Sequence, residues 1–303
     1  MTETPENYRC GYVALVGRPN VGKSTLLNHL LGQKISITSR KPQTTRHQIL
    51  GIKTTDDAQI IYVDTPGIHH KGKRAMNRYM NRAATSVLEG VHVVLFVVEV
   101  LRWTDEDELV LKRLKHSGLP VILVINKVDR LAEKEAMLPY LQEVSAKYDF
   151  KHVIPVSALK SDNLTALENS ILEFLEESAP WFPQEQVTDR SVRFLTAEII
   201  REKLTRGLGQ ELPYDLTVEI EQFREEKRKV HINALIWVER ANQKSIVIGK
   251  GGQRLKAIGQ QARKDIEAML DKKVFLELWV KVKEGWSDDE RAILSLGYHD
   301  QFE

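Results

Sequence analysis

The first 177 residues contain five short runs that are nearly continuous in apolar residues, namely YVALVG, QIIYVD, VHVVLFVVEV, LPVILVIN and HVIPVS. Strands that are covered on both faces show such runs, whereas half-exposed strands alternate. Helical patterns separate the runs, and a further run, HQILGIK, fits an edge strand. The pattern predicts an α/β domain at 10–177 with a doubly wound sheet of five parallel strands and one edge strand.

The pattern changes in the last third of the chain. A helical face covers residues 192–207, and two strands follow around 216–223 and 229–240, the second alternating between apolar and polar positions. Apolar residues at helical spacing continue over 255–269, and alternation returns over 274–282. These elements predict a second, α+β domain whose sheet has one covered face.

The two patterns are separated by SAPWFPQEQVTD, which has two prolines and no usable period and is predicted to be a linker. Near the C-terminus, Ser287 and Glu290 have the spacing of a helix capping box. The predicted divisions are a tail at 1–9, a first domain at 10–177, the linker at 178–189, a second domain at 190–285, and a C-terminal helix and tail at 286–303.

Composition narrows the class of protein. With 42% apolar and 28% charged residues, the 303-residue chain is typical of a soluble globular protein with two domains. No run approaches 18 apolar residues and the first residues lack the order of a secretory signal, so we expect a cytoplasmic protein. A single cysteine excludes an intramolecular disulfide. A net charge of +2 is too small to indicate a nucleic-acid partner, so any such signal must be local.

The motif GRPNVGKS follows the first apolar run and begins a helical pattern. In that context the glycines let successive backbone N–H groups face a phosphate, and the helix dipole adds positive charge. Lys23 brings a charge to the β and γ phosphates, and the Ser24 hydroxyl is a ligand for Mg²⁺. The predicted phosphate-binding residues are Gly17, Arg18, Pro19, Asn20, Val21, Gly22, Lys23 and Ser24.

A second motif, DTPG, begins where the run QIIYVD ends. Asp64 therefore lies at the carboxyl edge of the sheet, beside the phosphate loop, where it can hold Mg²⁺ through water. The Gly67 N–H can meet a γ phosphate. The nucleotide-contacting residues predicted here are Asp64, Thr65, Pro66, Gly67 and Ile68.

A third motif, NKVD, follows LPVILVI and predicts the choice of base. The Asp129 carboxylate can accept from two N–H groups of guanine, whereas adenine presents an acceptor at the matching ring position. Leaving that carboxylate unpaired should cost about 1 to 3 kcal/mol, which favours GTP over ATP. The residues predicted to contact or support the base are Asn126, Lys127, Val128, Asp129, Ser157, Ala158 and Leu159.

The order of GRPNVGKS, QTTRH at 43–47, DTPG, NKVD and SA resembles the translation-factor-related GTPases. The resemblance implies Mg²⁺-dependent hydrolysis of GTP to GDP. By position, Thr45 matches the threonine that reaches Mg²⁺ and the γ phosphate, with neighbouring Thr44 as the alternative. The residues that this assigns to catalysis are Lys23, Thr45 and Gly67, and those that it assigns to Mg²⁺ are Ser24, Thr45 and Asp64.

Ile68 departs from the pattern of Ras-like GTPases, which carry a water-orienting glutamine at this position. An isoleucine can neither donate nor accept a hydrogen bond, so water must be positioned in another way. Asn20 resembles the position at which some relatives hold K⁺, and a bound K⁺ could stabilise the charge that develops during hydrolysis. We treat K⁺ as a second expected cofactor.

In the second domain, SIVIGKGGQRLK contains a GxxG turn that we expect to lie between a β-branched strand and an amphipathic helix. Residues 240–264 include seven basic residues and no acidic one. The alternative interpretation of these basic residues is that they form the ordinary solvent-exposed face of a helix. The arrangement resembles a type II KH domain, in which the turn admits a single-stranded nucleic-acid backbone. The residues that the resemblance assigns to RNA are Ile246, Ile248, Gly249, Lys250, Gly251, Gly252, Arg254 and Lys256.

The chain as a whole resembles the Era-like family of translation-factor-related GTPases. The resemblance implies binding of 16S rRNA near its 3′ end, a role in rRNA maturation and small ribosomal subunit assembly, and peripheral membrane association. We expect a monomer in which GTP orders 38–53 and 64–74 and thereby changes RNA binding. Two alternatives are an RNA-modifying GTPase with a potassium-dependent nucleotide domain and a KH-type RNA-binding adaptor with little turnover.

Overall fold

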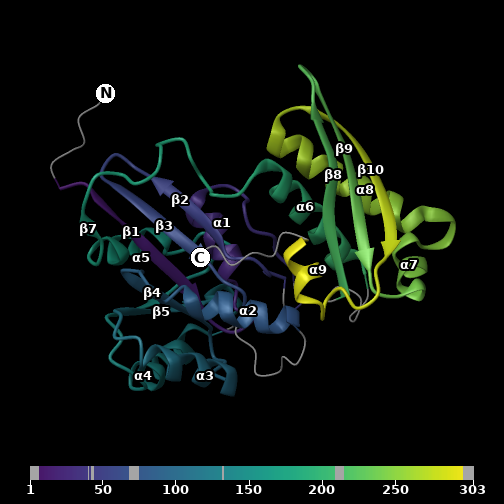
Figure 1. Ribbon diagram of the computed structural model, residues 1–303. Coiled ribbons are helices and arrows are strands. Elements are labelled where there is room, and N and C mark those ends of the chain that lie inside the picture. Colours follow the sequence, from purple (N-terminus) through teal and green to yellow (C-terminus); the bar gives the residue numbers. More distant parts are fainter. Residues whose placement is uncertain are drawn as a thin grey trace. The chain divides into compact units, whose positions relative to one another are not determined.

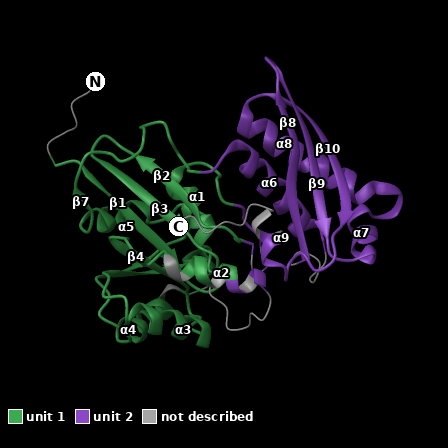
Figure 2. Ribbon diagram, in the orientation of Figure 1, with its two compact units in different colours: residues 1–36, 45–71, 79–189 green, residues 37–44, 72–78, 190–303 purple. Residues whose placement is uncertain are grey.

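The computed structural model describes residues 7–39, 41, 44–67, 75–131, 133–208 and 215–295. It divides into two compact units (Figure 2). The first unit comprises residues 1–36, 45–71 and 79–189, and the second comprises 37–44, 72–78 and 190–303. Two short segments that are early in the sequence therefore cluster with the C-terminal part of the chain.

The first unit contains a sheet with the strand order β2-β3-β1-β4-β5-β6 (Figure 1). Strands β1, β3, β4, β5 and β6 are parallel, while β2 is an antiparallel edge strand on β3. A two-residue strand, β7, pairs with β1. The bounds are β1 Arg9–Val16, β2 Ile49–Thr54, β3 Ala58–Asp64, β4 Val93–Glu99, β5 Val121–Asn126, β6 His152–Pro155 and β7 Glu176–Glu177. The predicted sheet of five parallel strands and one edge strand is confirmed.

Helices alternate with these strands, so the central strands are buried along almost their whole length. The helices are α1 Lys23–Leu31, α2 Ala75–Ser86, α3 Asp105–Leu114, α4 Met137–Ser145 and α5 Leu164–Leu172, with 3₁₀ turns at Val128–Arg130 and Lys134–Ala136. Helix α1 forms because Leu26, Leu27 and Leu30 share a face that is buried in the core. The order of the strands reverses between β1 and β4, and ligands of such folds bind beyond the carboxyl ends of strands at this point.

The second unit contains a three-stranded sheet with the order β10-β9-β8, in which β10 is parallel and β8 antiparallel to β9. Helices α6 and α8 cover one face of this sheet (Figure 1), and the alternating apolar residues of β9 point into that core. The bounds are α6 Val192–Gly207, β8 Leu216–Glu225, β9 Lys229–Val238, α7 Ala241–Ile248, a 3₁₀ turn at Lys250–Gly252, α8 Gln253–Leu270, β10 Lys273–Val282 and α9 Glu290–Ser295.

Two local predictions are wrong. The apolar run before the glycine turn is the end of helix α7, not a strand, because β9 ends at Val238 and the Gln243 side chain accepts the N–H groups of Glu239 and Arg240, which caps the helix. The Ser287 hydroxyl donates to the Glu239 carboxylate instead of capping a helix. None of the described helices combines the length and the apolar character that a membrane span needs.

Candidate functional site

The phosphate loop lies between the end of β1 and the start of α1, and it is joined to the third motif through Asn126. The Asn126 side-chain amide donates to the carbonyl of Val21 at 2.8 Å. Gly22 has φ 104°, and a Cβ built there would lie 2.3 Å from Asn126 Nδ2. A side chain at Gly22 would therefore both strain the loop and displace the amide that holds it.

Lys23 is the first residue of α1, and its ammonium group lies inside the loop. Its Nζ donates to the carbonyls of Gly17 at 2.9 Å and of Arg18 at 3.1 Å. Burial lowers the pKa of Lys23 to about 8, although the nearby Asp64 carboxylate opposes this shift. The charged form is therefore destabilised until an anion compensates for its lost hydration.

Two hydroxyl groups bond to the buried carboxylate of Asp64, which ends β3, and a third lies beside one of them. Ser24 Oγ and Ser36 Oγ donate to Asp64 Oδ2 at 2.7 and 2.8 Å, and Ser24 Oγ lies 2.8 Å from Thr45 Oγ1. Burial raises the pKa of Asp64, while hydrogen bonds from the serines and the charge of Lys23 act in the opposite direction.

This cluster fits Mg²⁺. Hydroxyl and carboxylate oxygens are the hard ligands that Mg²⁺ prefers, and neighbouring ligands of an octahedral ion at its usual bond length lie about 2.9 Å apart. The separation of Ser24 Oγ and Thr45 Oγ1 agrees with that spacing. In addition, Asp64 Oδ1 is buried and has no hydrogen-bond partner among the described residues, so it can accept from a water of the ion.

The two neighbouring threonines have different surroundings. Thr44 Oγ1 donates to the carbonyl of Lys41 at 2.7 Å and lies 2.6 Å from Ser39 Oγ. The hydroxyl of Thr45 instead meets that of Ser24. This arrangement favours Thr45 over Thr44 as a ligand of the metal.

The predicted guanine-contacting residues lie at the carboxyl ends of β5 and β6. Asn126 Oδ1 accepts from the N–H groups of Lys127 at 2.7 Å and of Ala158 at 3.0 Å. Asp129 Oδ1 accepts from the Ser157 hydroxyl at 2.5 Å, which orients the carboxylate. The fold thus brings the phosphate loop, NKVD and the segment after β6 together. Val128 follows in a 3₁₀ turn, and Leu159 is 68% exposed.

Other predicted residues are placed more simply. The Thr65 hydroxyl donates to the carbonyl of Leu15 at 2.8 Å and so faces β1. Gly67 approaches the phosphate loop so closely that a Cβ there would lie 2.7 Å from Pro19 Cγ. Asn20 is exposed with φ 64°, and its carbonyl accepts from Lys127 Nζ at 2.7 Å. Pro66 is buried, and Ile68 lies outside the described residues.

Sequence reasoning missed Ser36 and Glu99. Glu99 ends β4 and accepts from Arg18 at 3.1 Å, Lys127 at 3.1 Å and Arg130 at 3.0 Å. Burial alone would raise the pKa of Glu99, but hydrogen bonds and charges from Lys127 and Arg18 lower it overall. An acidic residue at the end of a buried parallel strand was a usable signal for Glu99, whereas no motif marks Ser36.

In the second unit the glycine turn leaves backbone accessible. Gly251 and Gly252 have φ 57° and 76°, and a Cβ built on either would meet none of the described residues within 4 Å. Gly249 differs, because a Cβ there would lie 2.7 Å from Arg254 Cβ. Gly252 therefore allows a backbone conformation with positive φ and leaves the space beside its peptide open, so that a ligand can approach closely.

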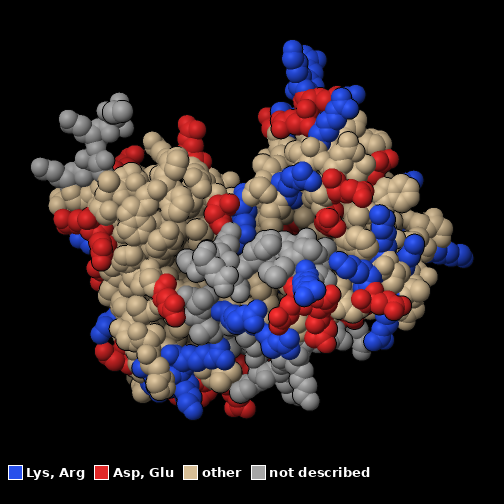
Figure 3. Space-filling model, in the orientation of Figure 1, with Lys and Arg blue, Asp and Glu red and all other residues tan. Residues whose placement is uncertain are grey.

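Basic and apolar side chains flank this turn. Lys250, Arg254 and Lys256 are exposed, and Arg254 Nη1 donates to the carbonyl of Ile246 at 2.6 Å, which holds the arginine beside the turn. Ile246 is 39% exposed and Ile248 is half-buried, so both can offer apolar surface. Acidic and basic side chains are interspersed on the face shown in Figure 3, so the acid-free turn is a local feature.

The sequence matches two family descriptions: "50S ribosome-binding GTPase" over residues 12–127 and "KH domain" over residues 211–287. GTPase Era of Pseudomonas aeruginosa is 58% identical over 298 residues, which cover 98% of each chain. These matches agree with the two domains predicted from the motifs.

Two solved structures are similar over nearly the whole chain. A variant of Aquifex aeolicus Era bound to GDP and aluminium fluoride has a TM-score of 0.93 and 41% identity, covering 96% of this chain and 100% of that one. Era in complex with MgGDPNP and nucleotides 1506–1542 of 16S ribosomal RNA has a TM-score of 0.94 and 41% identity, covering 97% and 100%. The chain belongs to the Era family of GTPases.

Proposed function

We propose that this GTPase is a nucleotide-controlled switch that binds 16S rRNA near its 3′ end and acts in rRNA maturation and small-subunit assembly. Residues 10–177 serve as the GTPase domain and 190–285 as the RNA-binding KH domain. The observation that carries the proposal is the open backbone of Gly251 and Gly252 between basic side chains. The similar Era structure that holds both MgGDPNP and 16S rRNA nucleotides supports the choice of RNA.

For the nucleotide, the hydroxyls of Ser24 and Thr45 would bind Mg²⁺ directly, and Asp64 would hold one of its waters. The metal supplies positive charge that polarises the phosphates. Lys23 contributes a second charge from inside the loop, and the Gly67 N–H contacts the γ phosphate. Asp129, oriented by Ser157, accepts from guanine. Because Ile68 cannot position water, that role belongs to another group.

For the RNA, the backbone passes over the glycine turn while Ile246 and Ile248 contact bases. Lys250, Arg254 and Lys256 neutralise phosphates. If about three phosphates of a single strand are neutralised, log affinity should fall against log salt with a slope of roughly −2. Four expectations stay predictions: the use of K⁺ at Asn20, peripheral membrane association, cytoplasmic location and a monomeric state.

The test places a negative charge where the RNA backbone should pass. Gly252→Asp should remove most of the affinity for an RNA oligonucleotide that carries the 3′ end of 16S rRNA, measured by fluorescence anisotropy, and should leave GTP binding nearly intact. Gly118→Asp is the matched control, because Gly118 also has positive φ, 69°, and open space around its Cβ position. Equal RNA affinity of the two variants would overturn the KH assignment.

A further inference from the structure

Residues 37–44 connect two residues of the candidate magnesium cluster. Ser36 precedes the segment and donates to Asp64, and Thr45 follows it and meets Ser24, all within the first unit. The segment itself clusters with the second unit, which carries the glycine turn (Figure 2). The position of Thr45 therefore depends on what holds the residues just before it.

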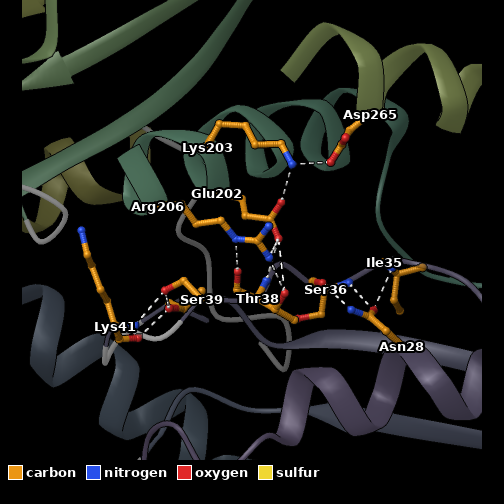
Figure 4. A network of polar contacts seen from close by, with 11 residues as sticks. Asn28, Ile35, Ser36, Thr38, Ser39, Lys41, Glu202, Lys203, Arg206 and Asp265 are labelled. Carbon is orange, nitrogen blue, oxygen red and sulfur yellow. Dashed lines mark hydrogen bonds and ion pairs between the residues drawn. The ribbon is translucent and has the colours of Figure 1, made fainter. Parts of the chain in front are cut away.

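Within the second unit, α6 binds every polar group of Thr38 (Figure 4). Glu202 Oε1 accepts from the Thr38 N–H at 3.0 Å and from its hydroxyl at 3.4 Å. Arg206 Nε donates to the Thr38 carbonyl at 2.9 Å, and its Nη2 donates to the Thr38 hydroxyl at 2.8 Å. Charge-assisted bonds to the N–H, the carbonyl and the hydroxyl of one residue make a specific anchor.

The same cluster reaches α8. Glu202 is fully buried, and its carboxylate pairs with Arg206 at 3.0 Å and with Lys203 at 3.1 Å. Lys203 also forms an ion pair with Asp265 of α8 (Figure 4). Helix α8 begins directly after the glycine turn, at Gln253, so one network of charged side chains, centred on the buried Glu202, joins this helix to the anchor of Thr38.

The far end of the segment is held in the same way. Arg201 is 1% exposed, pairs with Glu198 and donates to the carbonyl of Thr44, the residue before Thr45. Lys41 Nζ donates to the carbonyl of Leu208, which follows α6. Helix α6 and the residue after it thus contact both ends of the segment and its middle.

A second segment, 72–78, also clusters with the second unit, and it follows the DTPG motif. The N–H of Ala75 donates to Asp288 Oδ1 at 2.9 Å, and the N–H of Met76 donates to the carbonyl of Ser287 at 3.1 Å. The sequence predicts that 38–53 and 64–74 respond to GTP, and Ala75 and Met76 directly follow the second of these regions. Both residues bond to groups of the unit that carries the glycine turn.

We propose that Glu202 and Arg206 are positioning residues that clamp Thr38 on α6 and thereby set whether Thr45 can reach Mg²⁺. Through the Lys203–Asp265 pair the clamp also responds to RNA at the glycine turn. RNA then regulates use of the metal, and, because coupling is reciprocal, the nucleotide regulates RNA affinity. This inference rests on the proposed function and names the residues that carry its regulation.

The experiment compares the full-length wild type with Arg206→Ala and Glu202→Gln. GTP turnover is measured against Mg²⁺ concentration, with and without the 16S 3′-end oligonucleotide. In both variants the Mg²⁺ concentration for half-maximal turnover should rise by about 2- to 30-fold. In both, RNA should no longer change that concentration. GDP affinity without Mg²⁺ should not change, and Arg206→Lys should restore part of the effect.

Arg193→Ala is the matched control. Arg193 is an exposed arginine of the same helix, but its Nη2 donates to the carbonyl of Ile220 in β8 at 2.8 Å. If Arg206→Ala behaves like Arg193→Ala in both readouts, the clamp is refuted while the proposed function stands. If the wild type binds RNA without any change in its Mg²⁺ requirement, the coupling is refuted. A wild type that does not bind the oligonucleotide overturns the proposed function as well.

Discussion

At the scale of single residues, burial of charged groups determines how the nucleotide site behaves. Lys23 is 6% exposed and its charge is compensated only in part by carbonyls and by Asp64. A phosphate beside the ammonium group stabilises the charged form. The protonation of Lys23 should therefore be coupled to nucleotide binding.

This coupling predicts a pH dependence. The pKa of free Lys23 is lowered to about 8, and a bound phosphate raises it. Below that pH the free site is already charged, whereas above it binding must take up a proton, so affinity for GDP should fall about tenfold between pH 7 and pH 9. Titration calorimetry in buffers of different ionisation enthalpy would count the proton. Lys23→Arg keeps its charge over this pH range, so any change in its GDP affinity with pH reports the ionisation of guanine itself. If the GDP affinity of the wild type changes with pH in parallel with that of Lys23→Arg, the coupling is refuted.

The contact between Gly22 and Asn126 leads to a second prediction. Gly22→Ala adds strain at φ 104° and drives a methyl group into the Asn126 amide, so it should lower the free energy of unfolding by about 2 to 4 kcal/mol and weaken GTP binding at least tenfold. Gly32→Ala at the other end of α1 is the control, with φ 68° and open space at its Cβ position. It should cost only about 1 kcal/mol and leave GTP binding unchanged. Similar losses in both variants would count against the contact.

The site residues that belong to a sequence motif could be predicted from the sequence. The site residues that reach the site only through the fold of a loop could not. The glycines, Lys23, Ser24 and Asp64 come together as the spacing predicts because strand, loop and helix follow one another directly. Ser36 reaches Asp64 only because Asn28 Oδ1 accepts the N–H groups of Ile35 and Ser36, both at 3.0 Å (Figure 4). No local pattern encodes that turn.

At the scale of elements, long buried strands are the easiest to predict and short apolar runs the hardest. Strand β4 consists almost entirely of buried apolar residues, a pattern that predicts a strand covered on both faces. The run before the glycine turn has too few residues to reveal a period, and only Val247 of it is fully buried. The capping amide of Gln243 and its bond to Asp215 select the helix, and that is tertiary information.

The start of α2 gives a prediction at this scale. Asp288→Ala removes the acceptor of the Ala75 N–H, and losing such a cap typically costs about 1 kcal/mol. Hydrogen exchange should accelerate in the first turn of α2. Asp289→Ala serves as the control, because Asp289 Oδ1 accepts from the N–H of Arg291 in α9, so faster exchange should appear there instead. Unchanged exchange in α2 upon Asp288→Ala would contradict the assigned contact.

At the scale of the whole molecule, two cores were predictable because each part of the chain carries its own hydrophobic pattern. The assignment of 37–44 and 72–78 to the second unit was not predictable. It depends on polar pairs such as Thr38 with Glu202, which are 164 residues apart in the sequence. Such pairs leave no periodic signal in the sequence.

The most direct test of nucleotide-controlled RNA binding is the affinity of the full chain for the 16S 3′-end oligonucleotide, measured at one salt concentration with Mg²⁺ and either GDP or a non-hydrolysable GTP analogue. We predict that the GTP analogue tightens binding by at least about fivefold. Gly252→Asp should remove most of the affinity in both states. Equal affinity in the two nucleotide states would contradict the account.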